Sequence, residues 1–366
     1  MKKTSIWLLA VPTVLLMAMG FVFCWVTPVN ARLYGDGSHC FFTRMVCWTT
    51  IGLCLAICTY LVGWRRWLKA APFIAAGWVG LVVYAATFPL VNGHWGWISV
   101  GCFKVNVLEF APIVVALIVA YLVKLLRYKA TTMIALVLLT FGGYFGYQIA
   151  SNQNRLERLM QVLSQEQKAA DARQVSQAFL QNQCAGAIRE SKWFGSCDIN
   201  LRLLPESTTT CMPASATVLF GKWYLILLAL ALGMMGVGIG VAWRMASNEP
   251  MRAYALIWGG LVLVPCFLNI LGCVGFTPIF DFGIPFTCYG GTLVMSTLIG
   301  LAVLVSQQVE SASDKTLTCR DWAKAVIPVA AMVLVMLWGI LGVSLRENFS
   351  YLSAQEPQKQ VEGGAK

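Results

Sequence analysis

Charged residues are scarce in this chain of 366 residues: Asp, Glu, Lys and Arg together make up 12%. Histidine occurs twice, and the 13 cysteines include no Cys-x-x-Cys pair and no histidine partner at metal-binding spacing. The low charge excludes an ordinary soluble globular domain, in which about a quarter of the residues are charged. The cysteine spacing excludes the common zinc and redox motifs. The chain is instead 58% hydrophobic, which is typical of a membrane protein.

The apolar residues form runs long enough to cross a bilayer, which takes about 20 helical residues. The runs are Ser5–Val26, Met45–Gly63, Ala70–Val91, Val107–Val123, Thr131–Ala150, Trp223–Trp243, Ala253–Leu271, Tyr289–Val305 and Ala325–Leu345. Because lipid offers the backbone no hydrogen-bond partner, each run is predicted to be a helix. The predicted fold class is an all-α polytopic helical bundle of about nine spans within residues 1–345. The polar tail at 346–366 is expected to be disordered.

Lysine and arginine are unequally divided between alternate loops. One set of loops holds most of them: Lys2, Lys3, Arg65, Arg66, Lys69, Lys124, Arg127, Lys129, Arg244, Arg252, Lys315, Arg320 and Lys324. The positive-inside rule therefore predicts a cytoplasmic N-terminus. A cleaved signal peptide ending at Val29-Asn30-Ala31 is the alternative, but the first apolar run exceeds a signal h-region. The net charge of +11 is explained by this bias and by anionic membrane lipids, without a nucleic-acid partner.

One polar interval, Ser151–Gly221, separates the apolar runs and is predicted to be a large extracytoplasmic loop. Within it, Asn154–Phe179 has apolar residues at helical spacing and predicts an amphipathic helix on the outer membrane surface. The stretch from Gly195 to Thr217 is expected to be loop-like, because it contains prolines and clustered Ser and Thr. The interval could also hold one disulfide, with its pairing left open among Cys184, Cys197 and Cys211.

Two segments outside this interval resemble the SEDS family (FtsW, RodA and SpoVE), which polymerises lipid II into peptidoglycan. Asn92-Gly93-His94-Trp95-Gly96-Trp97-Ile98 and the following Phe103–Ala111 are similar to the family's N-G-x-R-R-W-I and F-x-F-Q-P-S-E-x-A, with both arginines missing. Asn269, Pro278 and Pro285-Phe286-Thr287-Cys288-Tyr289-Gly290-Gly291-Thr292 resemble the more specific family segment that ends in P-F-x-S-Y-G-G-S. Here Asp281 replaces a glycine and Cys288 a serine.

A third similar segment lies in the polar interval. Gln174-Val175-Ser176-Gln177 resembles the family's Y-Q-x-x-Q-S, and Leu204-Pro205-Glu206 resembles the start of L-P-E-x-H-T-D-F. The catalytic aspartate of that motif falls at Thr210. The resemblance covers most of residues 40 to 308 in the same order, with two spans fewer in the middle, so the polar interval stays on the same side.

The resemblance implies a peptidoglycan glycosyltransferase in the inner membrane of a bacterium, acting in division or elongation. Such a reaction needs a carboxylate base, and the candidates are Glu109, Glu206 and Asp198. A divalent metal ion could neutralise the leaving pyrophosphate. Expected partners are lipid II, membrane lipids and a class B penicillin-binding protein. Candidate substrate-binding residues are Asn92, Trp97, Lys104, Gln174, Gln177, Asn269, Asp281, Tyr289, Gly290 and Gly291.

Simpler interpretations stay open. Glu109 could cap a helix at water level near Lys104, while Glu206 and Asp198 could be solvated loop charges. Gly290 and Gly291 could serve close helix approach. At the level of function, Thr210 favours a non-catalytic relative that binds lipid II or a transpeptidase as a scaffold. A lipid transporter or flippase is the third possibility.

Overall fold

The computed structural model describes residues 2–27, 39–88, 96–100, 103–126, 142–143, 172–196, 208–277, 279, 282–311 and parts of 326–337. Its helices are α1 (Lys2–Val26), α3 (Cys40–Val62), α4 (Trp64–Ala85), α5 (Ala111–Leu126), α8 (Ala172–Glu190), α9 (Met212–Phe220), α10 (Lys222–Met245), α11 (Glu249–Cys273) and α12 (Gly291–Glu310). A short 3-10 helix, η1 (Val107–Phe110), leads into α5. The hairpin of β1 (Trp97–Val100) and β2 (Phe103–Asn106) precedes it.

Within the described residues, seven helical segments are long and apolar enough to span a membrane: α1, α3, α4, η1 with α5, α10, α11 and α12. They match seven of the predicted runs, so the prediction of an all-α membrane bundle is confirmed. Of the predicted span Thr131–Ala150, only Gly142 and Gly143 lie within the described residues, and both are helical. The described residues of Ala325–Leu345 are also helical, and Val333 lies against Gly233 of α10.

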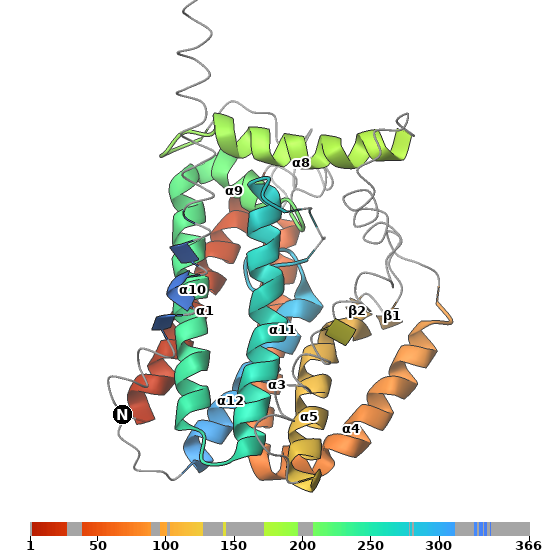
Figure 1. Ribbon diagram of the computed structural model, residues 1–366. Helices are drawn as coiled ribbons and strands as arrows, with labels where there is room; N and C mark the ends of the chain where they lie inside the picture. The colour runs from red at the N-terminus through yellow and green to blue at the C-terminus, as the bar shows by residue number, and fades with distance from the viewer. Residues whose placement is uncertain are drawn as a thin grey trace, which may run out of the picture.

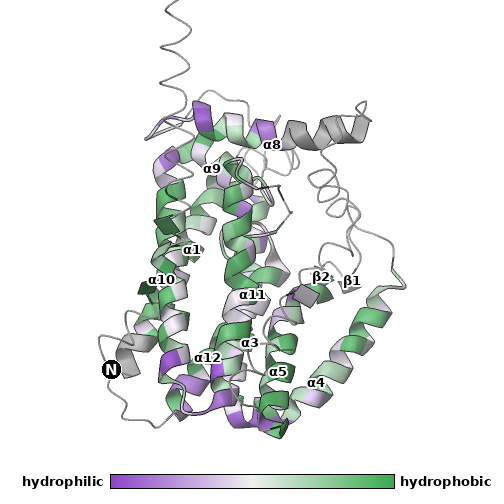
Figure 2. Ribbon diagram, viewed as in Figure 1, coloured by the Kyte–Doolittle hydropathy of each residue, from purple (hydrophilic) through white to green (hydrophobic). Residues whose placement is uncertain are grey.

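The spans run side by side, and α8 crosses one end of the bundle nearly at right angles to them (Figure 1). Helix α9 also lies at the α8 end, and the hairpin lies at the ends of α4 and α5 that face α8, about midway along the longer helices. The helix ends and turns that carry Arg65, Lys124 and Arg244 lie at the opposite end. Hydrophilic residues gather at that opposite end and along part of α8 (Figure 2). The alternation of basic and non-basic loops predicted from the sequence therefore corresponds to two distinct ends of the molecule.

Two predictions for the polar interval need correction. The amphipathic helix does not stop at Phe179, because α8 continues to Glu190; residues 154–171 lie outside the described part of the chain. The stretch from Gly195 to Thr217 is not loop-like throughout, because α9 begins at Met212. Pro213 does not prevent this helix, since proline in the first turn removes only an N–H that would lack an intrahelical acceptor.

Glycines let neighbouring segments approach closely at the α8 end of the bundle. A Cβ added to Gly291, the first residue of α12, would lie 2.2 Å from the Trp48 ring of α3. A Cβ added to Gly20 of α1 would lie 1.8 Å from the carbonyl oxygen of Phe286. These distances are far below van der Waals contact, so α1 and α3 reach the loop before α12 only because neither glycine has a side chain. The structural role predicted for Gly291 is confirmed by this contact.

Candidate functional site

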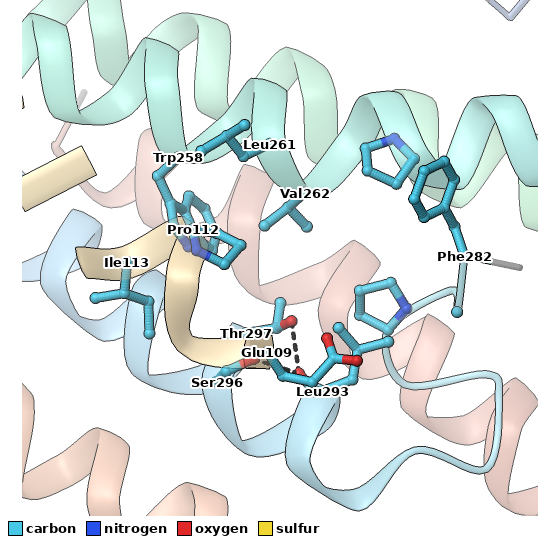
Figure 3. Close-up of a pocket in the computed structure, with 13 residues that line it drawn as sticks. Glu109, Pro112, Ile113, Trp258, Leu261, Val262, Phe282, Leu293, Ser296 and Thr297 are labelled. Carbon is cyan, nitrogen blue, oxygen red and sulfur yellow. Dashed lines mark hydrogen bonds between the residues drawn. The ribbon is translucent and has the colours of Figure 1, made fainter. Parts of the chain in front are cut away.

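A cavity lies between α5, α11, α12 and the loop that precedes α12 (Figure 3). Its volume is about 60 Å³, which is room for several waters. Most of the residues that line it are of apolar type, and Ser296 and Thr297 of α12 bear hydroxyl groups. Among the described residues that line it, Glu109 is the only ionisable one. A carboxylate at the end of a membrane span is a candidate functional group.

The hairpin and η1 position Glu109. Asn106, the last residue of β2, caps η1 by accepting a hydrogen bond from the Leu108 amide at 3.0 Å. Its own backbone N–H donates to Thr292 Oγ1 at 3.2 Å, which ties the hairpin to the first turn of α12. On the other side, Trp78 Nε1 of α4 donates to the Val107 carbonyl at 3.0 Å. Glu109 thus projects from a turn that is held by both α4 and α12.

The wall on the α12 side holds its hydroxyl groups in fixed positions. Ser296 Oγ donates to the Leu293 carbonyl at 3.0 Å, and Thr297 Oγ1 donates to the same oxygen at 2.8 Å. Figure 3 shows the Glu109 side chain beside Leu293 and Thr297, with α11 across the cavity. From α11, Trp258 contributes an indole N–H that is buried and has no hydrogen-bond partner among the described residues. The edge of the ring that carries this N–H packs against Gly300 of α12, where an added Cβ would lie 2.1 Å from Nε1.

The loop before α12 is held in an unusual conformation. Phe286 is fully buried and has a φ of 70°, a left-handed value that is rare for a non-glycine residue. Its carbonyl lies against Gly20, so the conformation is fixed by the neighbouring helix as well as by the buried ring. Strained backbone of this kind is found at binding and catalytic sites. The loop also supplies Phe282, Gly283 and Pro285 to the cavity.

Asn269 joins this loop to the segment that holds Thr210. Its side chain is fully buried, and Nδ2 donates to the Thr210 carbonyl at 3.2 Å and to the Phe282 carbonyl. Two further contacts connect the segments: the Tyr289 amide donates to the Thr208 carbonyl at 2.9 Å, and Cys288 Sγ to the Thr209 carbonyl at 3.2 Å. The turn at residues 208–211 is therefore fastened to the cavity loop.

The structure places the remaining predicted site residues as follows. Tyr289 packs its ring edge-on against Phe41 of α3, with ring centroids 4.6 Å apart. Trp97 stands at the start of the hairpin opposite Asn106, and its buried indole N–H has no partner within the described part of the chain. Lys104 is exposed on β2. Gly290 precedes α12 with only ordinary contacts around it, so close approach does not explain this glycine.

Several predicted residues cannot be located. Asp198, Glu206, Asn92 and Asp281 lie outside the described residues. Gln174 and Gln177 belong to α8, but only their backbone is described. Of the three predicted carboxylates, Glu109 is thus the one that the structure places in a site. Within the described ranges, no three or more His, Cys, Asp or Glu side chains come together as metal ligands. The cavity with its single carboxylate does not by itself fit a metal ion.

Thr210, which the sequence resemblance predicts to stand at the position of the family's catalytic aspartate, is almost completely buried, with 1% of its surface exposed. Its carbonyl accepts hydrogen bonds from Asn269 and, at 3.6 Å, from Cys273 Sγ. A threonine hydroxyl is not a base at neutral pH without activation, and this one lies in the interior. The sequence reasoning missed Trp258, Ser296 and Thr297, which stand in apolar runs where nothing distinguishes a residue facing a cavity from one facing a neighbouring helix.

Comparison with known proteins agrees with this architecture. The sequence model of the FtsW, RodA and SpoVE family, described as a cell cycle protein, matches residues 6–140 and 122–313. A peptidoglycan glycosyltransferase RodA from Treponema pallidum is 29% identical over 116 residues, which are 31% of this chain and 26% of that protein. A probable peptidoglycan glycosyltransferase FtsW from a Thioalkalivibrio species is 33% identical over 101 residues, 26% of this chain and 25% of that protein. The chain thus spans about a quarter of each of these curated relatives.

Solved structures show the same fold at low sequence identity. A chain from a peptidoglycan synthase complex that coordinates polymerization and crosslinking superposes with a TM-score of 0.65 at 15% identity, covering 84% of this chain and 98% of that one. RodA from Thermus thermophilus superposes with a TM-score of 0.57 at 19% identity and the same coverage. The family match extends over well more than half of the sequence and includes every element of the cavity. The chain belongs to the SEDS family (FtsW, RodA and SpoVE) and is a multi-pass protein of the bacterial inner membrane.

Proposed function

We propose that this protein is a peptidoglycan glycosyltransferase that polymerises lipid II, with Glu109 as its general base. The observation that carries the proposal is the position of Glu109, the one ionisable group among the described lining of a cavity that the most specific family segment helps to build. The names of the curated relatives support the reaction class.

In the proposed reaction, a sugar hydroxyl of the acceptor attacks the anomeric carbon of the donor. The bond from that carbon to the pyrophosphate oxygen breaks, and undecaprenyl pyrophosphate leaves with the bonding electron pair. Glu109 takes the proton of the attacking hydroxyl, a role that typically accelerates a reaction about 10²–10⁴-fold. The cavity of about 60 Å³ admits a hydroxyl group or waters, and the sugar rings would lie outside it.

The geometry around Glu109 suits this role. The backbone that carries it is fixed by Asn106 and Trp78, so the carboxylate would be held in place before substrate binds. We further propose that the α8 end is extracytoplasmic and the N-terminus cytoplasmic, because the basic loops share the opposite end. A class B penicillin-binding protein is the proposed partner, in line with the crosslinking complex of similar fold.

A second candidate function is a non-catalytic scaffold that binds lipid II or a transpeptidase. The burial of Thr210 is the observation that favours it, because the usual catalytic position offers neither a carboxylate nor access. The two functions differ in a direct assay. Purified protein in detergent or liposomes is incubated with fluorescent lipid II, and the products are separated by gel electrophoresis. Glycan strands are expected from the enzyme, whereas a folded protein that binds lipid II without making product would support the scaffold.

A further inference from the structure

Three thiols from distant parts of the sequence meet at the α8 end of the bundle. Cys184 lies in α8, Cys211 is the N-cap residue of α9, and Cys273 ends α11. All three side chains are fully buried. The Cys184 thiol is within hydrogen-bonding contact of both Cys211 and Cys273, and these contacts together with burial raise its pKa far above the ordinary value. Cys273 Sγ in turn donates to the Thr210 carbonyl at 3.6 Å.

We propose that Cys184 and Cys211 form a disulfide that ties α8 to the start of α9. Cys184 is the thiol common to both contacts, so it is one partner. Cys211 is the other, because Cys273 Sγ is directed to acceptors at its own helix end: the Thr210 carbonyl and, at 3.8 Å, Asn269 Oδ1. A metal ion does not explain the cluster, since no group of side chains in the described ranges has the arrangement of metal ligands.

A disulfide at this place would help to attach α8 to the rest of the bundle. This helix lies across the ends of the spans rather than among them (Figure 1). Two hydrogen bonds in the described part of the chain fasten it: Gln181 Nε2 donates to the Thr277 carbonyl at 3.1 Å, and Lys222 Nζ donates to the Arg189 carbonyl at 3.0 Å. A disulfide would close the loop of residues 185–210, and cross-links across loops of this length stabilise a fold by restricting its unfolded states.

The chemistry requires an oxidising side of the membrane, which is the side proposed for α8. Two thiols lose two protons and two electrons as the S–S bond forms. The electrons reduce the disulfide of a thiol–disulfide oxidoreductase to its dithiol form. Because the thiolate is the attacking species and burial keeps Cys184 protonated, the exchange would occur before α8 closes over the cluster. Once enclosed, the bond would be shielded from reductants.

Peptide mapping of the native chain tests the pairing. Intact cells are treated with N-ethylmaleimide, and the purified protein is digested with trypsin without reduction. Trypsin separates the relevant cysteines into peptides 174–189, 193–202, 203–222 and 253–315. Peptide 174–189 is expected to be joined to 203–222, and reduction should separate them. A peptide 174–189 that is not linked to 203–222, with Cys184 alkylated or as a free thiol, or a link from 174–189 to either of the other two peptides, would overturn the proposal.

Variants add a measurement that does not depend on that map. Cys184→Ser, Cys211→Ser and the double variant should each lose the linked pair and show the same increase in tryptic cleavage after Arg189. The matched control Cys273→Ser should keep both the link and the protection. If Cys273→Ser loses the protection from trypsin and Cys211→Ser keeps it, the partner of Cys184 is Cys273 and the proposal is wrong. The result is independent of whether the protein polymerises lipid II, because neither readout uses substrate.

Discussion

Replacing Asn269 with alanine should destabilise the protein more than an ordinary polar substitution. The amide holds two buried segments at once, the Thr210 turn and the cavity loop at Phe282. Each of these carbonyls would lose a donor that water cannot easily replace, at a cost of about 1 kcal/mol or more per bond. With the space left by the missing carboxamide, the expected loss of unfolding free energy is about 2–4 kcal/mol.

The matched control is Asn248→Ala at the opposite end of the same helix. Asn248 caps α11 by accepting a hydrogen bond from the Met251 amide at 3.0 Å, and loss of such a cap costs about 1 kcal/mol. The two variants are compared by heating them in detergent and measuring the temperature at which the buried thiols become reactive. Asn269→Ala should expose its thiols at a clearly lower temperature. Equal stability of the two variants would refute the cross-linking role of Asn269.

Other predictions concern close packing and the attachment of α8. Gly20→Ala and Gly291→Ala should each lower the melting temperature, because the added methyl group would overlap Phe286 or Trp48; Gly77→Ala on α4, where nothing lies within 4 Å, should not. Equal melting temperatures in all three would contradict the packing. Lys222→Met removes the donor to the α8 C-terminus and should speed tryptic cleavage of α8, while unchanged cleavage would show that this buried lysine does not hold the helix.

The bundle could be predicted because a membrane span has a minimum length and must be apolar, and both properties are visible in the sequence. The helix ends could not. Helix α4 begins at Trp64, six residues before the apolar run at Ala70, since Arg65, Arg66 and Lys69 at the basic end continue the helix. Helix α9 was not predicted, because its segment contains prolines, serines and threonines that are typical of loops. Its helix is stabilised by burial, since Met212 to Val218 are all buried, rather than by local helix propensity.

The site divides in the same way. Glu109 could be predicted because a carboxylate at the edge of an apolar run is conspicuous. The cluster of Cys184, Cys211 and Cys273 could not, because three elements far apart in sequence bring it together. Asn269 is a similar case: it was predicted as a substrate-binding residue and makes buried contacts that join two segments. A polar residue within a span signals importance without distinguishing binding from internal support. The substrate-binding role of Asn269 stays a prediction.

The central claim is that the carboxylate of Glu109 is the base for glycosyl transfer. The direct measurement is the initial rate of lipid II polymerisation by wild-type protein, by Glu109→Gln and by Glu249→Gln. Glu249 is a matched control that pairs with Arg252 at the basic end of the bundle. The account predicts a rate about 10²–10⁴-fold lower for Glu109→Gln and an unchanged rate for Glu249→Gln. If Glu109→Gln polymerises lipid II at the wild-type rate, Glu109 is not the base and the central claim is wrong.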